Sequence, residues 1–492
     1  MQERQSGILL PIFSLPGVYG IGTLGESARR FIDFLAEAGQ RVWQILPLVP
    51  TGMGNSPYMS PSAYAGNPIL LDLETLTSKG LITRQELNDA YSKDVDRIDY
   101  SRVWENRNIL LRKAWLRDRN HEARLAFFEQ QRDWLDDHAL FCALRAYFGC
   151  ALDKWPDDAV RRRTAKALAS YRVILAEEID YQIFLQYHFF EQWQALKRYA
   201  KQRNVAIMGD LPIYVSSDSV QVWVNPALFQ LDANLSPVRV AGVPPDAFAI
   251  SGQHWGNPLY DWVNQREALF GWWVDRLKKA ALLYDMLRLD HFRGFHSYWS
   301  IPAGSKSALE GCWEQGPGLP FVTHLTKQLP ELTLISEDLG DLDDSARDFI
   351  QRSGLPGMKV LIYAFDPQGE SAAMPHCCLK NSVMYTSTHD SPTFVEWLFS
   401  QATEAERDFA ISYLRLHPDE GFGWGAVCGA WISPSSLAIA PLQDILGLGG
   451  DARMNVPGTS GAHNWSWRVR SEALNDEVAA RLKKITQTYR RN

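Results

Sequence analysis

Three short apolar segments in the second half of the chain each end in acidic residues within a polar, turn-prone stretch. They span residues 286–291, 334–338 and 383–390. A run of four to eight apolar or β-branched residues bounded by turn residues is typical of a buried strand. Barrel enzymes carry their chemistry on side chains at the C-terminal tips of parallel strands. The spacing leaves room for a helix between successive segments, so the sequence predicts βα units whose carboxylates converge.

Asp290, Glu337 and Asp390 are the residue types that chemistry at a glycosidic bond requires. One carboxylic acid protonates the leaving oxygen, and a second carboxylate acts as nucleophile or as the base that activates water. A third acidic group holds the ring hydroxyls and favours distortion of the sugar ring. The three residues therefore indicate hydrolysis or transfer of glycosidic bonds.

Arg288 and Asp338 give two of these acids different surroundings. Residues i and i+2 of a strand point the same way, so the guanidinium of Arg288 is expected beside Asp290. Such a neighbour keeps a carboxylate ionised, which suits a nucleophile, although a purely structural Arg–Asp ion pair fits the same spacing. Glu337 has no cation within two residues and is followed by Asp338. We therefore expect the pKa of Glu337 to be raised, as a proton donor requires.

His291 and His389 flank two of the carboxylates. A single histidine is more often a buried core residue, but two of them beside strand-tip acids favour the binding of substrate hydroxyls. No pair of potential ligands has the helical spacing of H-E-x-x-H, so we expect no metal site.

The composition is that of an ordinary globular protein with a neutral ligand. Hydrophobic residues make up 46% of the chain and charged residues 22%, and the formal charge of −7 argues against nucleic acid as the main partner. Eighteen tryptophans favour carbohydrate, because the C–H faces of sugar rings stack on aromatic rings. Most of these tryptophans are nevertheless expected in the core. No cofactor motif occurs in the sequence.

The N-terminus and the cysteines indicate a cytoplasmic protein. The first residues are polar, and Pro11 and Pro16 interrupt the apolar stretch that follows, which does not fit a signal peptide. No segment approaches the ~20 continuous apolar residues of a membrane helix. The six cysteines lack paired zinc spacing, so a reduced compartment is expected. The sequence leaves open whether the protein is a monomer or a homodimer.

The N-terminal region follows the pattern of an α/β protein. Thr23 and Glu26 have the spacing of a capping box, apolar residues then recur at helical period, and Gly39 occupies the position of a C-terminal cap. Residues 42–48 are typical of a strand. A helix joined to a strand by a short link is characteristic of alternating α/β folds.

The rest of the chain predicts one barrel enlarged by insertions. Residues from about 75 to 200 are rich in helix formers, and residues 211–262 are rich in Pro and Gly. Further strand signals lie at 205–210, 358–365 and 437–442. We predict a (β/α)₈ TIM barrel over residues 1–492, with a helical insertion at about 75–200 and a loop-rich insertion over the cleft at about 211–262. A doubly wound sheet with a cap domain would instead carry a Gly-rich phosphate-binding fingerprint, which is absent.

Motifs spread over nearly the whole chain make the prediction more specific. The sequence resembles the amylomaltases, the bacterial and plant 4-α-glucanotransferases (disproportionating enzymes) that are related to the α-amylases. The matching segments are residues 6–10, 15–22, 43–48, 56–58, 65–68, 209–215, 242–248, 252–258, 288–294, 337–340 and 452–455. The number and order of these motifs carry the resemblance.

The resemblance implies a role for each candidate residue. Asp290 corresponds to the nucleophile that forms a glucosyl-enzyme, Glu337 to the acid/base, and Asp390 to a third carboxylate that binds ring hydroxyls. The remaining positions correspond to substrate-binding residues: Ser56, Tyr58, Asp210, Trp255, Arg288, His291, His389 and Asn464. Residues 242–256 resemble a loop over the cleft, and the chain ends too soon after its last strand to hold the C-terminal β-domain of related enzymes.

Two departures from the family pattern stand out. After Asp390 the family usually has Asn-Asp-Thr, whereas this chain has Ser391-Pro392-Thr393. Ser followed by Pro is a good N-cap and first-turn pair, so the helix start is expected to survive, while the acceptor side loses whatever the Asn and Asp contribute. His463 stands before Asn464 where the family usually has Gly.

The leading hypothesis is transfer of an α-1,4-glucan segment to the 4-hydroxyl of an acceptor glucose or glucan, with retention through a covalent glucosyl-enzyme. Malto-oligosaccharides are the expected partners, with no nucleic acid, membrane, metal or cofactor. An α-amylase-like hydrolase differs only in acceptor affinity and water access, which a sequence does not show. An inactive glucan-binding protein would be expected to lack one of the three acids. Donor length and cyclic glucan formation are likewise left open.

Overall fold

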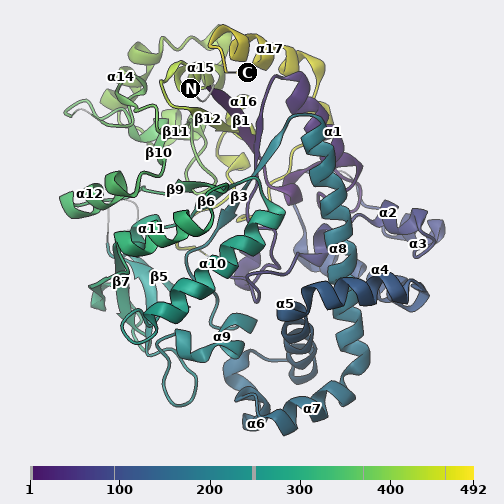
Figure 1. Ribbon diagram of the computed structural model, residues 1–492. Helices are drawn as coiled ribbons and strands as arrows, with labels where there is room; N and C mark the ends of the chain where they lie inside the picture. Colours follow the sequence, from purple (N-terminus) through teal and green to yellow (C-terminus); the bar gives the residue numbers. More distant parts are fainter. Residues whose placement is uncertain (1–3, 94, 246–250, 370, 460, 492) are drawn as a thin grey trace.

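The computed structural model describes residues 4–93, 95–245, 251–369, 371–459 and 461–491. Within these residues, eight parallel strands close into a barrel in the order β1-β12-β11-β10-β9-β6-β3-β2. The barrel occupies the upper part of the molecule in Figure 1. Its strands are β1 (Gln5–Leu9), β2 (Val42–Gln44), β3 (Ala206–Leu211), β6 (Met286–Leu289), β9 (Thr333–Ser336), β10 (Gly357–Val360), β11 (Ser382–Tyr385) and β12 (Leu437–Pro441). The predicted (β/α)₈ barrel is confirmed.

The barrel strands are short and apolar because helices cover their outer side and side chains fill their interior. All four residues of β11 and all five residues of β12 are buried. Strands buried on both faces show continuous apolar runs rather than alternation, which is the signal that the sequence displays. In the register of β3 and β6, Asp210 lies opposite Arg288. The barrel therefore places an acid and a cation side by side near its C-terminal end.

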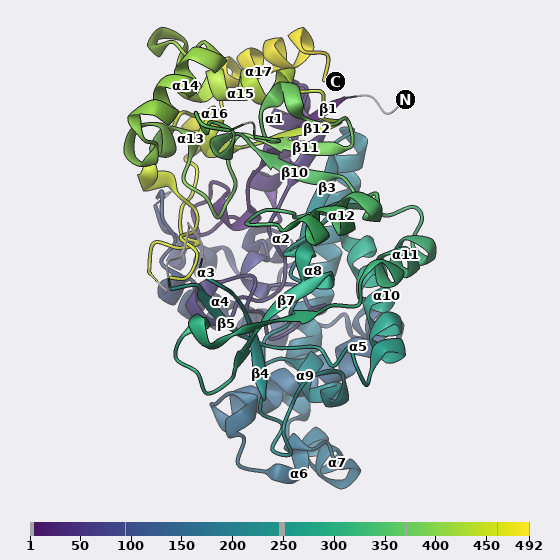
Figure 2. The ribbon, with the colours of Figure 1, turned by 90° about the vertical axis from the view of Figure 1, so that its left-hand side faces the viewer.

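The helices cover the barrel and extend well beyond it (Figures 1 and 2). Their bounds are α1 (Glu26–Glu37), α2 (Leu73–Ser78), α3 (Arg84–Asp89), α4 (Tyr100–Arg117), α5 (His121–Phe148), α6 (Asp158–Arg161), α7 (Ala165–Ile174), α8 (Ala176–Gln202), α9 (Val220–Val224), α10 (Arg266–Leu283), α11 (Leu319–Gln328), α12 (Asp344–Ser353), α13 (Phe394–Glu396), α14 (Glu404–Leu414), α15 (Phe422–Ile432), α16 (Leu442–Ile445) and α17 (Asp476–Thr488). No described helix has both the length and the apolar character needed to cross a membrane.

Helix α8 joins the helical region between β2 and β3 to the barrel. It packs on α5 within that region and on α1 and β3 of the barrel, and Figure 1 shows it running from one to the other. Its Gln186 side chain exchanges two hydrogen bonds with the backbone of Gly66, at 2.8 and 3.0 Å. Its Gln192 side chain does the same with Asp72, at 2.7 and 3.2 Å. The chain that follows β2 is thereby fastened to α8.

A second, antiparallel sheet lies beside the barrel, with the order β5-β4-β7-β8. Its strands are β4 (Arg239–Val243), β5 (Gln253–Pro258), β7 (Ser297–Pro302) and β8 (Cys312–Gln315). The expectation of an irregular segment over residues 211–262 is therefore incomplete, since β4 and β5 lie in it. Residues 246–250, part of the segment expected to resemble a cleft loop, lie outside the described residues.

Local predictions near the N-terminus have mixed outcomes. Gly39 follows α1 in the left-handed region, at φ +72°, as the C-cap prediction requires. The capping box of Thr23 and Glu26 is wrong, because α1 begins at Glu26 with Gly25 as its N-cap. The Thr23 hydroxyl instead donates to Asp72 at 3.1 Å. The Thr23 hydroxyl therefore binds a residue that is distant in the sequence, Asp72, instead of capping α1.

Two predicted strands are shorter than expected. The strand predicted for residues 42–48 ends at Gln44, shortly before Pro47, which has no backbone N–H to donate. The strand predicted for residues 358–365 ends at Val360 and continues as a 3₁₀ turn, Leu361–Tyr363. A short buried apolar run does not distinguish strand from helical turn by composition.

Candidate active site

A cavity of about 520 Å³ lies at the C-terminal end of the barrel, where the sequence predicted the carboxylates to meet. Its lining includes eight of the predicted site residues: Ser56, Tyr58, Trp255, Arg288, Asp290, His291, Glu337 and Asp390. This position, between the strand tips and the loops that follow them, is where barrel enzymes bind substrate. Among the described residues, no group of three His, Cys, Asp or Glu side chains could hold a metal ion.

Arg288 lies between two carboxylates in this cavity. Its Nη1 donates to Asp290 at 2.8 Å and to the two oxygens of Asp210 at 2.9 and 2.7 Å. The contact with Asp290 arises because this residue directly follows β6, two positions after Arg288, and so points the same way. The contact with Asp210 arises because Asp210 and Arg288 are paired across β3 and β6. Asp210 is only 1% exposed and does not line the cavity, so it orients Arg288 from below.

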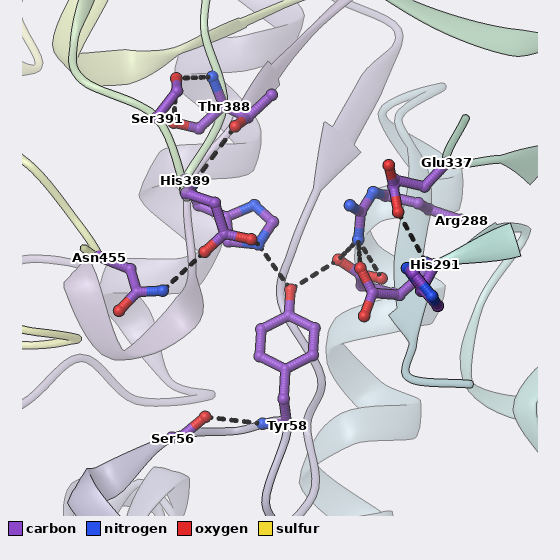
Figure 3. Close-up of polar contacts among 12 residues, drawn as sticks. Ser56, Tyr58, Arg288, His291, Glu337, Thr388, His389, Ser391 and Asn455 are labelled. Carbon is purple, nitrogen blue, oxygen red and sulfur yellow. Dashed lines mark hydrogen bonds and ion pairs between the residues drawn. The ribbon is translucent and has the colours of Figure 1, made fainter. Parts of the chain in front are cut away.

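Glu337 is held by two backbone amides. Its Oε2 accepts from the N–H of His291 at 2.7 Å, and its Oε1 accepts from the N–H of Leu339 at 2.8 Å. Figure 3 shows the first of these contacts next to Arg288. His291 adopts a left-handed conformation, at φ +51°, which is uncommon for a residue with a side chain. This conformation occurs at the turn where β6 ends and the cavity begins.

Burial changes the ionisation of the two central carboxyls. Burial raises the pKa of Asp290 to about 7, with Arg288 opposing the shift and the neighbouring acids adding to it. Burial also raises the pKa of Glu337, although Arg288 and the two backbone amides act to lower it. The raised pKa of Glu337 agrees with the prediction. The pKa of Asp290 does not, because Arg288 was expected to keep this pKa low and it is raised instead. The negative charge of Glu337 is among the neighbours that raise the pKa of Asp290.

Asp390 is kept ionised by polar neighbours. Its Oδ2 lies 3.2 Å from Nε2 of His389, and its Oδ1 accepts from Nδ2 of Asn455 at 2.7 Å. Although burial raises the pKa of Asp390, His389 and Asn455 lower it well below its usual range. Burial lowers the pKa of His389, but Asp390 outweighs this and raises it. The two residues therefore stabilise each other's charged forms.

Tyr58 connects the Asp210–Arg288 ion pair to the His389–Asp390 ion pair (Figure 3). Its hydroxyl donates to Oδ2 of Asp210 at 2.8 Å and lies 2.7 Å from Nε2 of His389. Because the single phenolic proton is used by Asp210, Nε2 of His389 is the donor toward Tyr58. Through Arg288, a continuous chain of polar contacts runs from Asp290 to His389 and Asp390.

The other predicted residues divide into cavity-lining and supporting positions. The indole of Trp255 lines the cavity and packs edge-on against His291, with ring centroids 4.9 Å apart. Ser56 lines the cavity and accepts from the N–H of Tyr58 at 3.2 Å. Asn464 is buried away from the cavity lining, where its side chain accepts from Val456 N and donates to Thr459 O. It therefore shapes the turn that precedes it.

Asn455 was not predicted as a site residue, yet it lines the cavity and binds Asp390. It stood in the sequence only as the end of the 452–455 motif. No spacing rule connects an amide to a carboxylate 65 positions earlier in the chain. The contact exists because two loops from different strands meet at the same end of the barrel.

The first family departure is accommodated without loss of the helix. The Ser391 hydroxyl accepts from the N–H of Thr388 at 2.9 Å and closes a turn, instead of capping a helix. Thr393 is the N-cap of α13, and its side chain accepts from Glu396 N. The predicted capping role of Ser391 is wrong, although the helix start survives as expected. The second departure, His463, is exposed and does not line the cavity.

Comparisons with known proteins agree with this geometry. The family described as 4-alpha-glucanotransferase matches residues 10–474 of the chain. The 4-alpha-glucanotransferase of Clostridium butyricum is 41% identical, covering 98% of this chain and 99% of that protein, and the one of a Synechocystis strain is 44% identical, covering 100% and 99%. The structure of the amylomaltase from Streptococcus agalactiae in complex with acarbose superposes with a TM-score of 0.96 at 40% identity, covering 100% of both chains.

Proposed function

Because the chain belongs to the 4-alpha-glucanotransferase family, it is a glycosyltransferase, and we propose that Asp290 and Glu337 transfer α-1,4-glucan segments by double displacement. The observation that carries this proposal is the unequal surroundings of the two acids across one cavity. Arg288 donates a charge-assisted hydrogen bond to Asp290, whereas Glu337 accepts from two neutral backbone amides. Of the two acids, Asp290 is therefore the one on which the negative charge is better stabilised, and Glu337 the one that carries the proton.

In the first step, Asp290 attacks the anomeric carbon of the donor sugar while Glu337 protonates the glycosidic oxygen. The bond between that carbon and the leaving oxygen breaks, and an ester to Asp290 forms. The shorter glucan leaves with the proton of Glu337. Arg288 orients the attacking carboxylate, so the reacting atoms meet without a search for the correct rotamer.

In the second step, the carboxylate of Glu337 removes the proton from the 4-hydroxyl of an acceptor glucan or glucose. The resulting oxygen attacks the anomeric carbon, and the ester to Asp290 breaks. Two inversions give net retention. Glu337 ends protonated and Asp290 ionised, which returns the site to its starting state.

Asp390, His389 and Tyr58 bind the donor sugar in this proposal. Each oxygen of Asp390 keeps a lone pair beyond those facing His389 and Asn455, so it can accept from a ring hydroxyl. Trp255 offers an aromatic face to a neighbouring glucose unit. Transfer predominates over hydrolysis when acceptor sugar, rather than water, occupies the space beside the ester.

We further propose one catalytic barrel over residues 1–492, with insertions at about 75–200 and 211–262. Malto-oligosaccharides are the proposed donors and acceptors, glucose is a further acceptor, and the protein is proposed to be a cytoplasmic monomer or homodimer. All six cysteines are free thiols, which supports a reduced compartment.

Incubation of the purified protein with maltotriose tests the function. Disproportionation produces glucose and a ladder of longer maltodextrins at a constant number of reducing ends. A rise in reducing ends without longer products would instead identify an α-amylase-like hydrolase, and absence of both would identify a glucan-binding protein without activity.

A further inference from the structure

One buried carboxylate outside the proposed transfer steps holds both ends of the loop that follows β11, residues 386–393. Asp444 lies in α16, after β12, and is fully buried. Its Oδ2 accepts from the hydroxyls of Thr386 at 2.5 Å and Ser387 at 2.6 Å, at the start of the loop. Its Oδ1 accepts from the backbone N–H of Phe394 at 2.7 Å, just beyond the loop's end.

Such a carboxylate is costly to bury unless its oxygens are satisfied. Burial raises the pKa of Asp444, while the hydrogen bonds from Ser387, Thr386 and Phe394 oppose the rise. All three donors lie at the two ends of the loop: Thr386 and Ser387 begin it, and Phe394 directly follows it. The hydrogen-bonding capacity of this side chain is therefore directed at one structural element.

The residue before Asp444 holds the neighbouring loop. Nε2 of Gln443 donates to the carbonyl of Ala452 at 3.2 Å. Three residues later Asn455 donates to Asp390. Gln443 and Asp444 are adjacent in the chain and both buried. The same short helix, α16, therefore binds the 386–393 loop through Asp444 and the segment that leads to Asn455 through Gln443.

We propose that Asp444 is a positioning residue for glucan transfer, which sets the 386–393 loop so that His389 and Asp390 face Tyr58 and the donor sugar. The inference rests on the proposed function. Hydrogen bonds inside the loop, such as that between Ser391 and Thr388, shape the turn but do not place it relative to the barrel. Asp444 supplies such a placement, because it links both ends of the loop to α16, the helix that directly follows the adjacent strand β12.

Small displacements of this loop are expected to matter. Nε2 of His389 lies 2.7 Å from the Tyr58 hydroxyl, and a hydrogen bond weakens sharply when its atoms separate by a further ångström. A shift of about 1 Å in a positioned group can cost about 10²-fold in rate. Loss of the Asp444 contacts should therefore appear in kinetics as well as in stability.

The test compares Asp444→Ala, Asp444→Asn and a matched control, Asp118→Ala. Asn preserves the size of the side chain and an oxygen for Phe394 N–H, whereas Ala leaves all three donors without a partner. Asp118 is similarly buried, at 4% exposure, and accepts from Asn120 N and Arg124 in the helical region, away from the cavity. The thermal midpoint, kcat and KM for maltotriose disproportionation are measured for each variant.

We expect Asp444→Ala to lower kcat/KM by at least about thirtyfold. Asp444→Asn should recover a substantial part of this loss. Asp118→Ala should lower the thermal midpoint yet leave kcat/KM within about twofold of wild type. Unchanged kinetics in folded Asp444→Ala, or an equal kinetic loss in Asp118→Ala, would overturn the proposal.

Two further arms keep the result interpretable. Should Asp444→Ala fail to fold, Ser387→Ala and Thr386→Val each remove one hydroxyl and must lower kcat/KM without affecting folding. Calorimetric titration of maltotetraose into Asp290→Asn, with and without Asp444→Ala, or with Ser387→Ala should Asp444→Ala fail to fold, measures positioning without turnover. Weaker binding in the double variant supports the inference even where wild type shows no transfer, and equal binding contradicts it.

Discussion

The backbone N–H of His291 donates to Oε2 of Glu337 at 2.7 Å, so the residue that follows the proposed nucleophile also orients the proposed acid/base. The left-handed conformation of His291 is part of the turn that makes this contact. Asp290 and Glu337 directly follow two adjacent strands, β6 and β9, which pair in parallel. The geometry between the two acids is thus fixed by backbone atoms and not by flexible side chains alone.

Replacing Asp290 with Asn should abolish transfer and preserve sugar binding. The amide cannot form the ester, so we expect kcat for maltotriose to fall by about 10⁴-fold or more. Calorimetry with maltotetraose should still detect binding. Asp275→Asn, on the exposed surface of α10, is the control and should match wild type. Turnover that persists in Asp290→Asn would remove Asp290 from its assigned role.

Replacing Glu337 with Gln should block the first step for a glucan donor but not for a donor whose leaving group needs no proton. A natural glucan needs its leaving oxygen protonated, whereas fluoride leaves without a proton. With an α-maltosyl fluoride donor, we therefore expect a glycosyl-enzyme to accumulate in Glu337→Gln, detected by intact-protein mass spectrometry. Adding azide, an acceptor that needs no deprotonation, should release it. No accumulation with the fluoride would contradict the acid role.

The ion pair of His389 and Asp390 should give a defined pH dependence of stability. The pKa of Asp390 is lowered, so its contribution is present above the unfolded value of about 3.9 and is lost as pH falls through the folded pKa. The pKa of His389 is raised, so its contribution is present below about 6.5 and is lost as pH rises through the folded pKa. The unfolding free energy of wild type relative to Asp390→Asn should therefore be greatest between about pH 4 and 6.5.

Urea unfolding of both proteins from pH 3 to pH 9 provides this measurement. A difference in unfolding free energy that stays constant across the whole range would show that the two side chains do not interact in the folded protein. The same titrations with His389→Gln should show no decline above pH 6.5, because the titrating imidazole is gone.

Replacing Asn455 with Ala should weaken donor binding. Asp390 loses the hydrogen bond from Nδ2, its pKa rises, and its orientation toward the sugar becomes less defined. A hydrogen bond to a charged group contributes about 1.5–3 kcal/mol, so we expect kcat/KM to fall by about tenfold or more. Asn264→Ala, which removes an exposed Asn–Asp hydrogen bond away from the cavity, is the control. Equal kinetics in Asn455→Ala and wild type would show that Asp390 is held by other contacts.

The sequence predicts the barrel and its carboxylates because both depend on short-range patterns. Arg288 and Asp290 point to the same side because a strand has a two-residue period, and the apolar run of β6 marks that strand. The family motifs then give the order of the remaining site residues. These signals need no knowledge of which segments lie together in space.

Features that depend on distant contacts were missed. Strand β4 pairs with β7, although β5, α10 and β6 lie between them in the chain. No local sequence pattern predicts that pairing. Thr23 fits a capping box, but Asp72 binds its hydroxyl in the folded protein. Asp290 lies beside Arg288 as predicted, yet burial among other acids raises its pKa instead of lowering it.

The path of α8 limits how this protein can be redesigned. One uninterrupted helix of 27 residues packs on both the helical region and the barrel. Its Gln186 and Gln192 side chains form hydrogen bonds with the backbone of the segment that follows β2. A shortened or exchanged helical region should therefore be cut on the N-terminal side of Gln186. A graft that replaces α8 as a whole would release the polypeptide that carries Tyr58, even though every catalytic residue remained in place.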